Sequence, residues 1–316
     1  MIFVPHNYKR DVHGILLVDK HQGPSSNTIL QDVKKIYYAN KAGHTGTLDP
    51  IATGMLPICF GEATKFAQYL LNAKKNYHVV ARLGENTTTA DSYGSIIQKR
   101  PITFTQVHLN GALEKFRGDF LQTPPMFSAV KYHGKQLYKY AKKGINIQRK
   151  PRLITVHNLH LIEWRNEELE LEICCSKGTY IRTIIDSLGE ILGCGAHVIK
   201  LHRLQVGHYP VNSMVSLCHL HQIIQSAIKQ NISPLKLLDL LLLPIDSTLI
   251  ELPIINLSSD TASRFKKGQT VKVKNFLYEG IVKVTEGKDN IFIGIALFNN
   301  FYLAPHRLVS QSIVVK

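Results

Sequence analysis

The sequence predicts an α+β protein in two parts, a larger part that mixes helices with strands and a smaller C-terminal part made of strands. The 316 residues correspond to about two domains at roughly 150 residues each. Hydrophobic residues make up 44% and charged residues 19%, which is typical of a folded globular chain and excludes a disordered or fibrous one. Helix and strand patterns alternate up to about residue 250, whereas only short β-like runs follow Pro253. We therefore expect domains at 1–250 and 251–316.

The elements follow from apolar spacing. Residues 15–18 form a short apolar run typical of a buried strand, and residues 77–83 alternate as a strand does. Ser25 or Ser26 can cap a helix whose apolar residues up to Tyr37 keep helical spacing. The other patterns predict helices at 63–73, 105–117, 179–192 and 214–245, and strands at 153–164, 168–176, 196–206, 281–284, 291–297 and 302–303.

The charge balance indicates a polyanionic partner. Lys and Arg number 38 against 23 Asp and Glu, which gives a net charge of +15. A soluble protein this basic usually meets nucleic acid or an acidic membrane surface. Residues 120–162 contain no acidic residue and eight basic ones, with Tyr132, Tyr138 and Tyr140 among them. Lysines can contact phosphates, and tyrosines can stack on unpaired bases. A charged run is also commonly a solvated surface, so both interpretations stay open here.

The cysteines and apolar runs indicate a cytoplasmic protein. The five cysteines are odd in number and form no Cys-x-x-Cys pair, so neither a disulfide framework nor a zinc ribbon is expected. Residues 1–6 lack the charged-then-apolar pattern of a signal peptide. The apolar run near 237–245 is interrupted by Asp239 and Pro244, and it is shorter than the ~20 residues that a bilayer requires.

The loop at 43–54 is the strongest candidate for a functional site. Its glycines permit tight turns, and Pro50 restricts Asp49 to extended conformations. Asp49 is thus a single carboxylate on a constrained loop. It can be a turn-capping residue or a catalytic nucleophile or base. No second acid lies nearby in sequence, which disfavours a two-carboxylate hydrolase, and His44 with Asp49 lacks the spacing of a metal site.

Four separated motifs resemble the TruB family of tRNA pseudouridine-55 synthases. They are GHTGTLDPIATGMLP at 43–57, LGENTTTADSYG at 83–94, CSKGTYIRT at 175–183 and LGEILGCGAHVIKLHR at 188–203. The resemblance runs from about residue 12 to the C-terminus. It implies that Asp49 is a nucleophile, attacking either the sugar C1′ or the base C6. The N1–C1′ bond of a uridine breaks and the base rejoins through C5, without cofactor or metal. The uridine must first leave the RNA stack.

The resemblance also implies a uracil pocket around Asp49. Tyr77 matches the tyrosine that stacks on the flipped base, and Arg182 matches the arginine that pairs with the carboxylate. Tyr180 and Leu201 match positions that line the pocket. His44 matches the histidine that stacks where the RNA bases rearrange. Taken singly, each of these residues has an ordinary role in a core or on a surface, so the motifs carry the assignment.

Two further residues match the surroundings of that pocket. Lys20 is expected to support the pocket or to contact RNA, although His21 follows it where many members have proline. Asp91 matches a motif near the RNA-binding and active-site region, and an aspartate before Gly94 can equally serve a turn.

The resemblance finally implies a fold and a partner. We expect a mixed, largely antiparallel catalytic sheet, an RNA-gripping insertion at about 120–152 and a PUA-like C-terminal domain. The expected partner is the T-arm of tRNA, bound by a monomer that can also assist tRNA folding, with no role for DNA or a membrane. A non-catalytic RNA-binding protein on the same scaffold is the alternative. A DNA-binding regulator lacks a helix-turn-helix or zinc pattern to support it.

Overall fold

The computed structural model describes residues 9–274 and 276–310. The expectation about a signal peptide concerns residues 1–6 and lies outside the described residues. Within these ranges, no helix combines the length and the apolar composition needed to cross a lipid bilayer.

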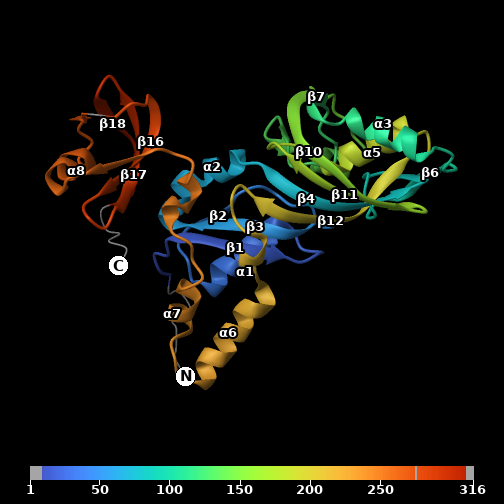
Figure 1. Ribbon diagram of the computed structural model, residues 1–316. Helices are drawn as coiled ribbons and strands as arrows, with labels where there is room; N and C mark the ends of the chain where they lie inside the picture. The colour runs from blue at the N-terminus through green and yellow to red at the C-terminus, as the bar shows by residue number, and fades with distance from the viewer. Residues whose placement is uncertain (1–8, 275, 311–316) are drawn as a thin grey trace.

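A nine-stranded sheet forms the centre of the larger part (Figure 1). Its strands are β1 (Gly14–Lys20), β2 (Ala42–His44), β3 (Thr53–Phe60), β4 (Lys75–Leu83), β7 (Gly118–Gln122), β10 (Arg152–Arg165), β11 (Glu168–Cys175), β12 (Ala196–Val206) and β13 (Val215–Ser216). The order is β13-β1-β3-β12-β4-β11-β10-β7, and β2 also pairs with β3. Only β1–β13 and β3–β12 are parallel pairs in this described sheet, which confirms the expected mixed, largely antiparallel arrangement.

Helices cover this sheet unevenly. They are α1 (Ser26–Ile36), α2 (Ala67–Asn72), α3 (Gln106–Glu114), α4 (Leu137–Ala141), α5 (Ile181–Ile191), α6 (Leu217–Lys229) and α7 (Pro234–Asp239), with 3-10 turns η1 (Gly61–Phe66), η2 (Val211–Ser213) and η3 (Ile245–Leu249). The apolar faces of α1, α3 and α5 share one core with the sheet. A second core joins η1 and α2 to β1 and β3. Because β1 lies between the two cores, it is buried on both faces and reads as a continuous apolar run.

The C-terminal part is a five-stranded sheet with its own core, as the sequence predicted. Its elements are β14 (Ile254–Leu257), α8 (Ser259–Lys266), β15 (Val271–Lys272), β16 (Gly280–Glu286), β17 (Ile291–Asn299) and β18 (Tyr302–Leu308). Helix α8 was not predicted, because only Ala262 and Phe265 of its eight residues are buried and two residues set no clear period. The rings of Phe292 and Phe66 pack edge to face at 5.3 Å, which joins this sheet to η1.

Two other differences have local causes. Strand β3 was not predicted, since Gly54 and Pro57 interrupt its apolar residues. The single helix expected over 214–245 is divided, because Pro234 starts α7 at a position where a new helix tolerates proline.

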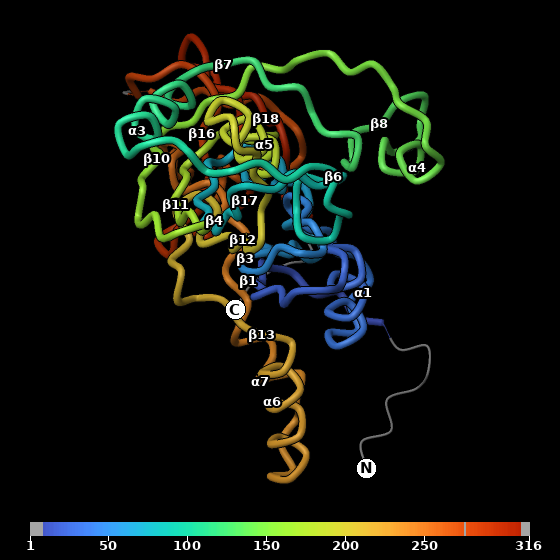
Figure 2. The backbone as a smooth tube through the Cα atoms, turned by 90° about the vertical axis from the view of Figure 1, so that its right-hand side faces the viewer, coloured from blue at the N-terminus to red at the C-terminus, as the bar shows by residue number. Residues whose placement is uncertain are grey.

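The segment between β7 and β10 extends away from the sheet. Figure 2 shows β8 (Lys131–Tyr132) and α4 at the edge of the molecule, far from α6 and α7. Three short strands remain. Strand β9 (Lys135–Gln136) pairs with β8, and β5 (Glu85–Thr87) pairs with β6 (Ile96–Lys99). Seven of the eight basic residues between 131 and 152 are exposed, the exception being half-buried Arg149.

Candidate active site

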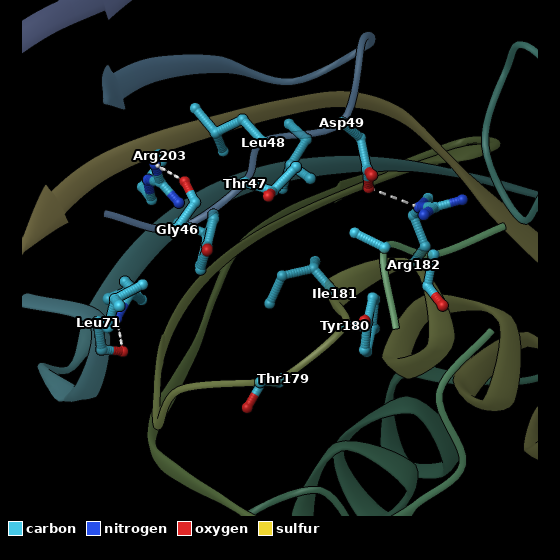
Figure 3. A pocket seen from close by; sticks show the side chains of 16 residues that line it. Gly46, Thr47, Leu48, Asp49, Leu71, Thr179, Tyr180, Ile181, Arg182 and Arg203 are labelled. Atoms are coloured by element: carbon cyan, nitrogen blue, oxygen red, sulfur yellow. Dashed lines mark hydrogen bonds and ion pairs between the residues drawn. The ribbon is translucent and has the colours of Figure 1, made fainter. Parts of the chain in front are cut away.

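A pocket of about 260 Å³ lies where the loop after β2, strands β4 and β12, and the start of α5 meet (Figure 3). Four parts of the chain line this pocket. The lining residues include Gly46–Asp49 from the loop, Lys75, Tyr77, Leu201 and Arg203 from the strands, Tyr180–Arg182 at the start of α5, and Ser128 and Ala129 from the segment between β7 and β10. Five of the eight predicted site residues therefore meet here. Lys20, His44 and Asp91 lie outside this lining.

The loop that carries Asp49 is fixed on both sides of that residue. Ser25 is the N-cap of α1, which leaves Ser26 free to accept from the Leu48 N–H at 2.7 Å and to donate to the Leu48 carbonyl at 3.1 Å. On the other side, the Ala52 N–H donates to the Asp49 carbonyl at 3.0 Å. The Asp49 side chain remains 32% exposed, so a held carboxylate faces the pocket opening.

Arg182 lies beside Asp49, the residue with which the family resemblance pairs it. Its Nε lies 2.9 Å from Oδ2 of Asp49, and its Nη1 lies 3.2 Å from Oδ2 of Asp91. The same guanidinium donates to the carbonyls of Thr89 (2.9 Å) and Phe127 (2.8 Å). Four contacts hold the buried guanidinium in one orientation beside the carboxylate.

The Asp91 side chain has two functions. Its Oδ1 accepts from Thr89 Oγ1 at 2.6 Å and from the Tyr93 N–H at 3.0 Å, which stabilises a turn. Its Oδ2 pairs with Arg182. Asp91 therefore stabilises a turn and also contacts the site, because its Oδ2 pairs with the guanidinium that lies beside Asp49.

The environment of Asp49 raises the pKa of its carboxyl above 3.8. Partial burial is the largest cause, because removing a carboxyl from water disfavours its charged form. The positive charge of Arg182 acts in the opposite direction and stabilises the carboxylate.

Aromatic and aliphatic side chains supply the walls. Tyr77 on β4 is buried in register with Arg203, and burial raises the pKa of its hydroxyl. Leu201 lies two residues before Arg203 on β12 and is buried. Tyr180 is fixed at the start of α5 by Gln122, which accepts from its N–H at 2.8 Å and donates to its carbonyl at 3.1 Å. These surfaces can enclose a flat ring.

Lys20 holds the Asp49 loop through backbone carbonyls. It is fully buried, and its ammonium donates to the carbonyls of Ala52 (2.7 Å), His21 (3.0 Å) and Pro50 (3.5 Å). Burial lowers the pKa of Lys20 to about 8, against an opposing effect of Asp49. Of the two roles expected for Lys20, the geometry supports the structural one. The histidine at position 21 leaves this contact intact, because it uses a backbone carbonyl.

His44 ends β2, just before the Asp49 loop. Its Nδ1 is buried and has no hydrogen-bond partner among the described residues, and burial lowers the pKa of the ring. A neutral imidazole at this position can stack or accept a proton.

Sequence reasoning assigned no role to Lys75 and Arg203, although both line the pocket. A signal was present, since Lys75 precedes Tyr77 by two residues and Arg203 follows Leu201 by two. Residues two apart on a strand face the same side of a sheet. A lysine or arginine that shares the inward-facing side of a strand with predicted pocket residues is thus a candidate site residue. Within the described ranges, no group of three His, Cys, Asp or Glu side chains is arranged to hold a metal ion.

Comparison with known proteins defines the class first. A model of the TruB family pseudouridylate synthase N-terminal domain matches residues 34–181. The tRNA pseudouridylate synthase B C-terminal domain matches 182–250, and the pseudouridine synthase II TruB C-terminal domain matches 253–309. The matched domains are thus those of a pseudouridine synthase, which is an isomerase.

Relatives of similar length show which family of pseudouridine synthases the chain belongs to. The tRNA pseudouridine synthase B of Serratia proteamaculans is 55% identical over 97% of this chain and 98% of its own. That of Photorhabdus laumondii is 56% identical over the same shares. The chain belongs to the TruB family of pseudouridine synthases.

Solved structures support the fold alone. One is an H/ACA RNP bound to a substrate RNA containing 2′-deoxyuridine, with a TM-score of 0.72, 19% identity and coverage of 95% of this chain and 86% of that one. A Cbf5-Nop10-Gar1 complex gives a TM-score of 0.71 at 22% identity, covering 94% of this chain and 84% of that one.

Proposed function

We propose that this protein is a tRNA pseudouridine synthase that converts uridine 55, in the T-arm loop of tRNA, to pseudouridine. The observation that carries the proposal is a partly exposed carboxylate, Asp49, held by Arg182 at a pocket with an aromatic wall. Relatives that are 55% and 56% identical over nearly the whole chain carry the name tRNA pseudouridine synthase B.

The pocket suits a single flipped base. Its volume of about 260 Å³ is small, and Tyr77, Leu201 and Tyr180 offer apolar surface to a ring. Extruding a base from its stack costs a few kcal/mol, which such contacts can offset. Asp49 attacks as the nucleophile, either at C1′ or at C6. The N1–C1′ bond breaks, the base turns, C5 bonds to C1′, and the bond to Asp49 breaks again. The C5 hydrogen leaves as a proton and N1 takes up a proton, so no atoms are gained or lost. No cofactor or metal takes part.

The extended segment at about 120–152 grips the RNA. Its exposed lysines can meet phosphates, and Tyr132 is exposed for stacking. The segment also reaches the pocket, because the Phe127 carbonyl accepts from Arg182 and Ser128 lines the cavity. RNA bound on the segment would therefore lie next to Asp49.

We further propose that residues 1–250 form the catalytic domain and residues 251–316 a PUA-like RNA-binding domain. The C-terminal segment 252–316 has nine basic and four acidic residues, a net charge of 9 − 4 = +5. The protein acts as a monomer in the cytoplasm. Gripping the T-arm can also assist tRNA folding, and this activity needs no nucleophile.

Tritium release tests the proposal. T-arm RNA labelled with tritium at uridine C5 must lose its label, since C5 forms the new bond to the sugar. The native protein should release one tritium per modified site, and Asp49→Asn should release none while binding the RNA with unchanged affinity. Bound RNA that keeps its label with the native protein would leave only the binding and folding hypothesis.

A further inference from the structure

The two ends of the pocket differ in charge. Figure 3 shows Asp49 and Arg182 together at one end and Arg203 next to Gly46 at the other. Asp91 lies behind Arg182, so two carboxylates share one guanidinium at the first end. Arg203 and Lys75 both lie against Gly46, where an added Cβ would be 3.6 Å from Arg203 Nη1 and 3.8 Å from Lys75 Cε. Neither cation forms an ion pair within the described residues.

Both cations are buried, and backbone carbonyls are their hydrogen-bond partners. Arg203 is 1% exposed and donates to the carbonyls of Met55 (2.7 Å, from Nε) and Gly46 (3.1 Å, from Nη2). Lys75 is 6% exposed, and its ammonium donates to the carbonyls of Leu70, Leu71 and Ala73 at 2.7 to 3.1 Å. These carbonyls accept from Nε and Nη2 of Arg203 and from the Lys75 ammonium, but as neutral groups they do not provide a counter-ion.

A buried charge without a counter-ion is costly, and this pocket keeps two of them side by side. Burial lowers the pKa of Lys75 to about 8, and the nearby charge of Arg203 acts in the same direction. Such an arrangement is reasonable where an anion forms during the reaction, because a fixed charge then stabilises a transient state more than the resting one.

The reaction places negative charge on the base. When N1–C1′ breaks, its electron pair stays on the ring and spreads over N1, O2 and O4. Attack at C6 instead places the charge on O4 as an enolate. The charge is discharged when C5 bonds to C1′. The C5 proton then leaves and N1 takes up a proton, so the base ends neutral. We propose, on the basis of the function proposed above, that Arg203 and Lys75 form a cationic wall that stabilises this anionic form of the uracil ring.

The first test compares Arg203→Lys with Arg203→Gln. Lys keeps the charge, whereas Gln can still donate to a carbonyl but is neutral. Single-turnover tritium release at saturating RNA should fall on the order of 100-fold in R203Q and clearly less in R203K, the size seen when one stabilising donor is removed. RNA affinity should match the native protein in both. Equal rates for the two variants would show that Arg203 only fixes the loop, and would overturn the proposal.

The second test changes the substrate. A C4 thiocarbonyl makes the ring anion more stable, so 4-thiouridine at the target position depends less on the wall. The deficit of R203Q relative to the native protein should therefore shrink with 4-thiouridine RNA. An equal deficit on both substrates would contradict a role in stabilising the anion.

Lys75→Met provides an independent variant if R203Q is poorly folded, which its thermal unfolding midpoint would show. K75M should lower single-turnover release on the order of 10-fold, with the same dependence on the substrate. A native rate in K75M would exclude Lys75 from the wall and overturn the proposal as stated. The two proposals fail in different ways. If the native protein released no tritium from bound RNA, the proposed function itself would fail; if only the variants behaved otherwise than expected, the cationic wall alone would fail.

Discussion

Arg182 connects the two carboxylates of the site, Asp49 and Asp91. One guanidinium thereby balances part of two negative charges and keeps the Asp49 carboxylate oriented without blocking the pocket. Burial raises the pKa of Asp49, and Arg182 opposes that rise. The protonation state of Asp49 thus depends on the neighbour that positions it.

The pH dependence of the chemical step should report this balance. Asp49 must be ionised to attack, so the single-turnover rate should fall as pH drops through its raised pKa, at a pH above 3.8. In Arg182→Met the opposing charge is lost, and the acid limb should move to higher pH. Arg182→Lys keeps a cation and should move the limb less. An acid limb at the same pH in all three proteins would contradict the assigned coupling.

At the scale of elements, the Asp49 loop ends where β3 and β12 lie very close. Gly54 has φ +95°, and an added Cβ would lie 2.3 Å from the carbonyl oxygen of Arg203. Both the conformation and the space therefore require glycine at this position. The close approach positions the loop's end against the strand that carries Leu201 and Arg203.

Gly54→Ala should therefore lower the free energy of unfolding by several kcal/mol, because both strain and a backbone clash are introduced. Gly111→Ala in α3 is the matched control, since nothing lies within 4 Å of its added Cβ. That variant should be more stable by about 0.5–1 kcal/mol, as alanine favours a helix interior. Urea unfolding measures both changes. A G54A protein as stable as the native one would refute the packing described at this junction.

The longer strands and most helices could be predicted where their apolar periods are regular, as in β4 and α5, whereas short strands such as β5, β6, β8 and β9 were not predicted. Strand β3 and helix α8 could not, since one is interrupted by Gly54 and Pro57 and the other buries only two side chains. The sheet order came from the family resemblance, because periodicity alone does not pair strands. The Asp49–Arg182 contact came from the same source, since 133 residues separate its partners. Lys75 and Arg203 went unassigned because no motif assigns them a role.

Charge is distributed unevenly over the whole molecule. The segment at 120–152 and the C-terminal part carry exposed cations, whereas α6 and α7 lie away from that segment and carry only Lys229 and Lys236 (Figure 2). The segment at 120–152 alone contributes +8 to the net charge of +15.

Salt dependence should reveal this distribution. Each phosphate contact contributes about 0.7–0.9 to the slope of log affinity against log salt. Replacing Lys142 and Lys143 by Gln should reduce the slope for T-arm RNA by about 1 to 2, whereas replacing Lys229 and Lys236 should leave it unchanged. Equal losses from both pairs would indicate a nonspecific effect of net charge. Fluorescence anisotropy titrations at several salt concentrations provide the measurement.

The central claim is that Asp49 converts one T-arm uridine to pseudouridine. The most direct measurement is nucleoside analysis of an unmodified tRNA transcript after incubation, with the modified position mapped by a pseudouridine-specific carbodiimide adduct. The native protein should produce one pseudouridine per tRNA, at position 55, and Asp49→Asn should produce none. Pseudouridine made by the Asp49→Asn protein at the native rate, or none made by the native protein on bound tRNA, would contradict the account.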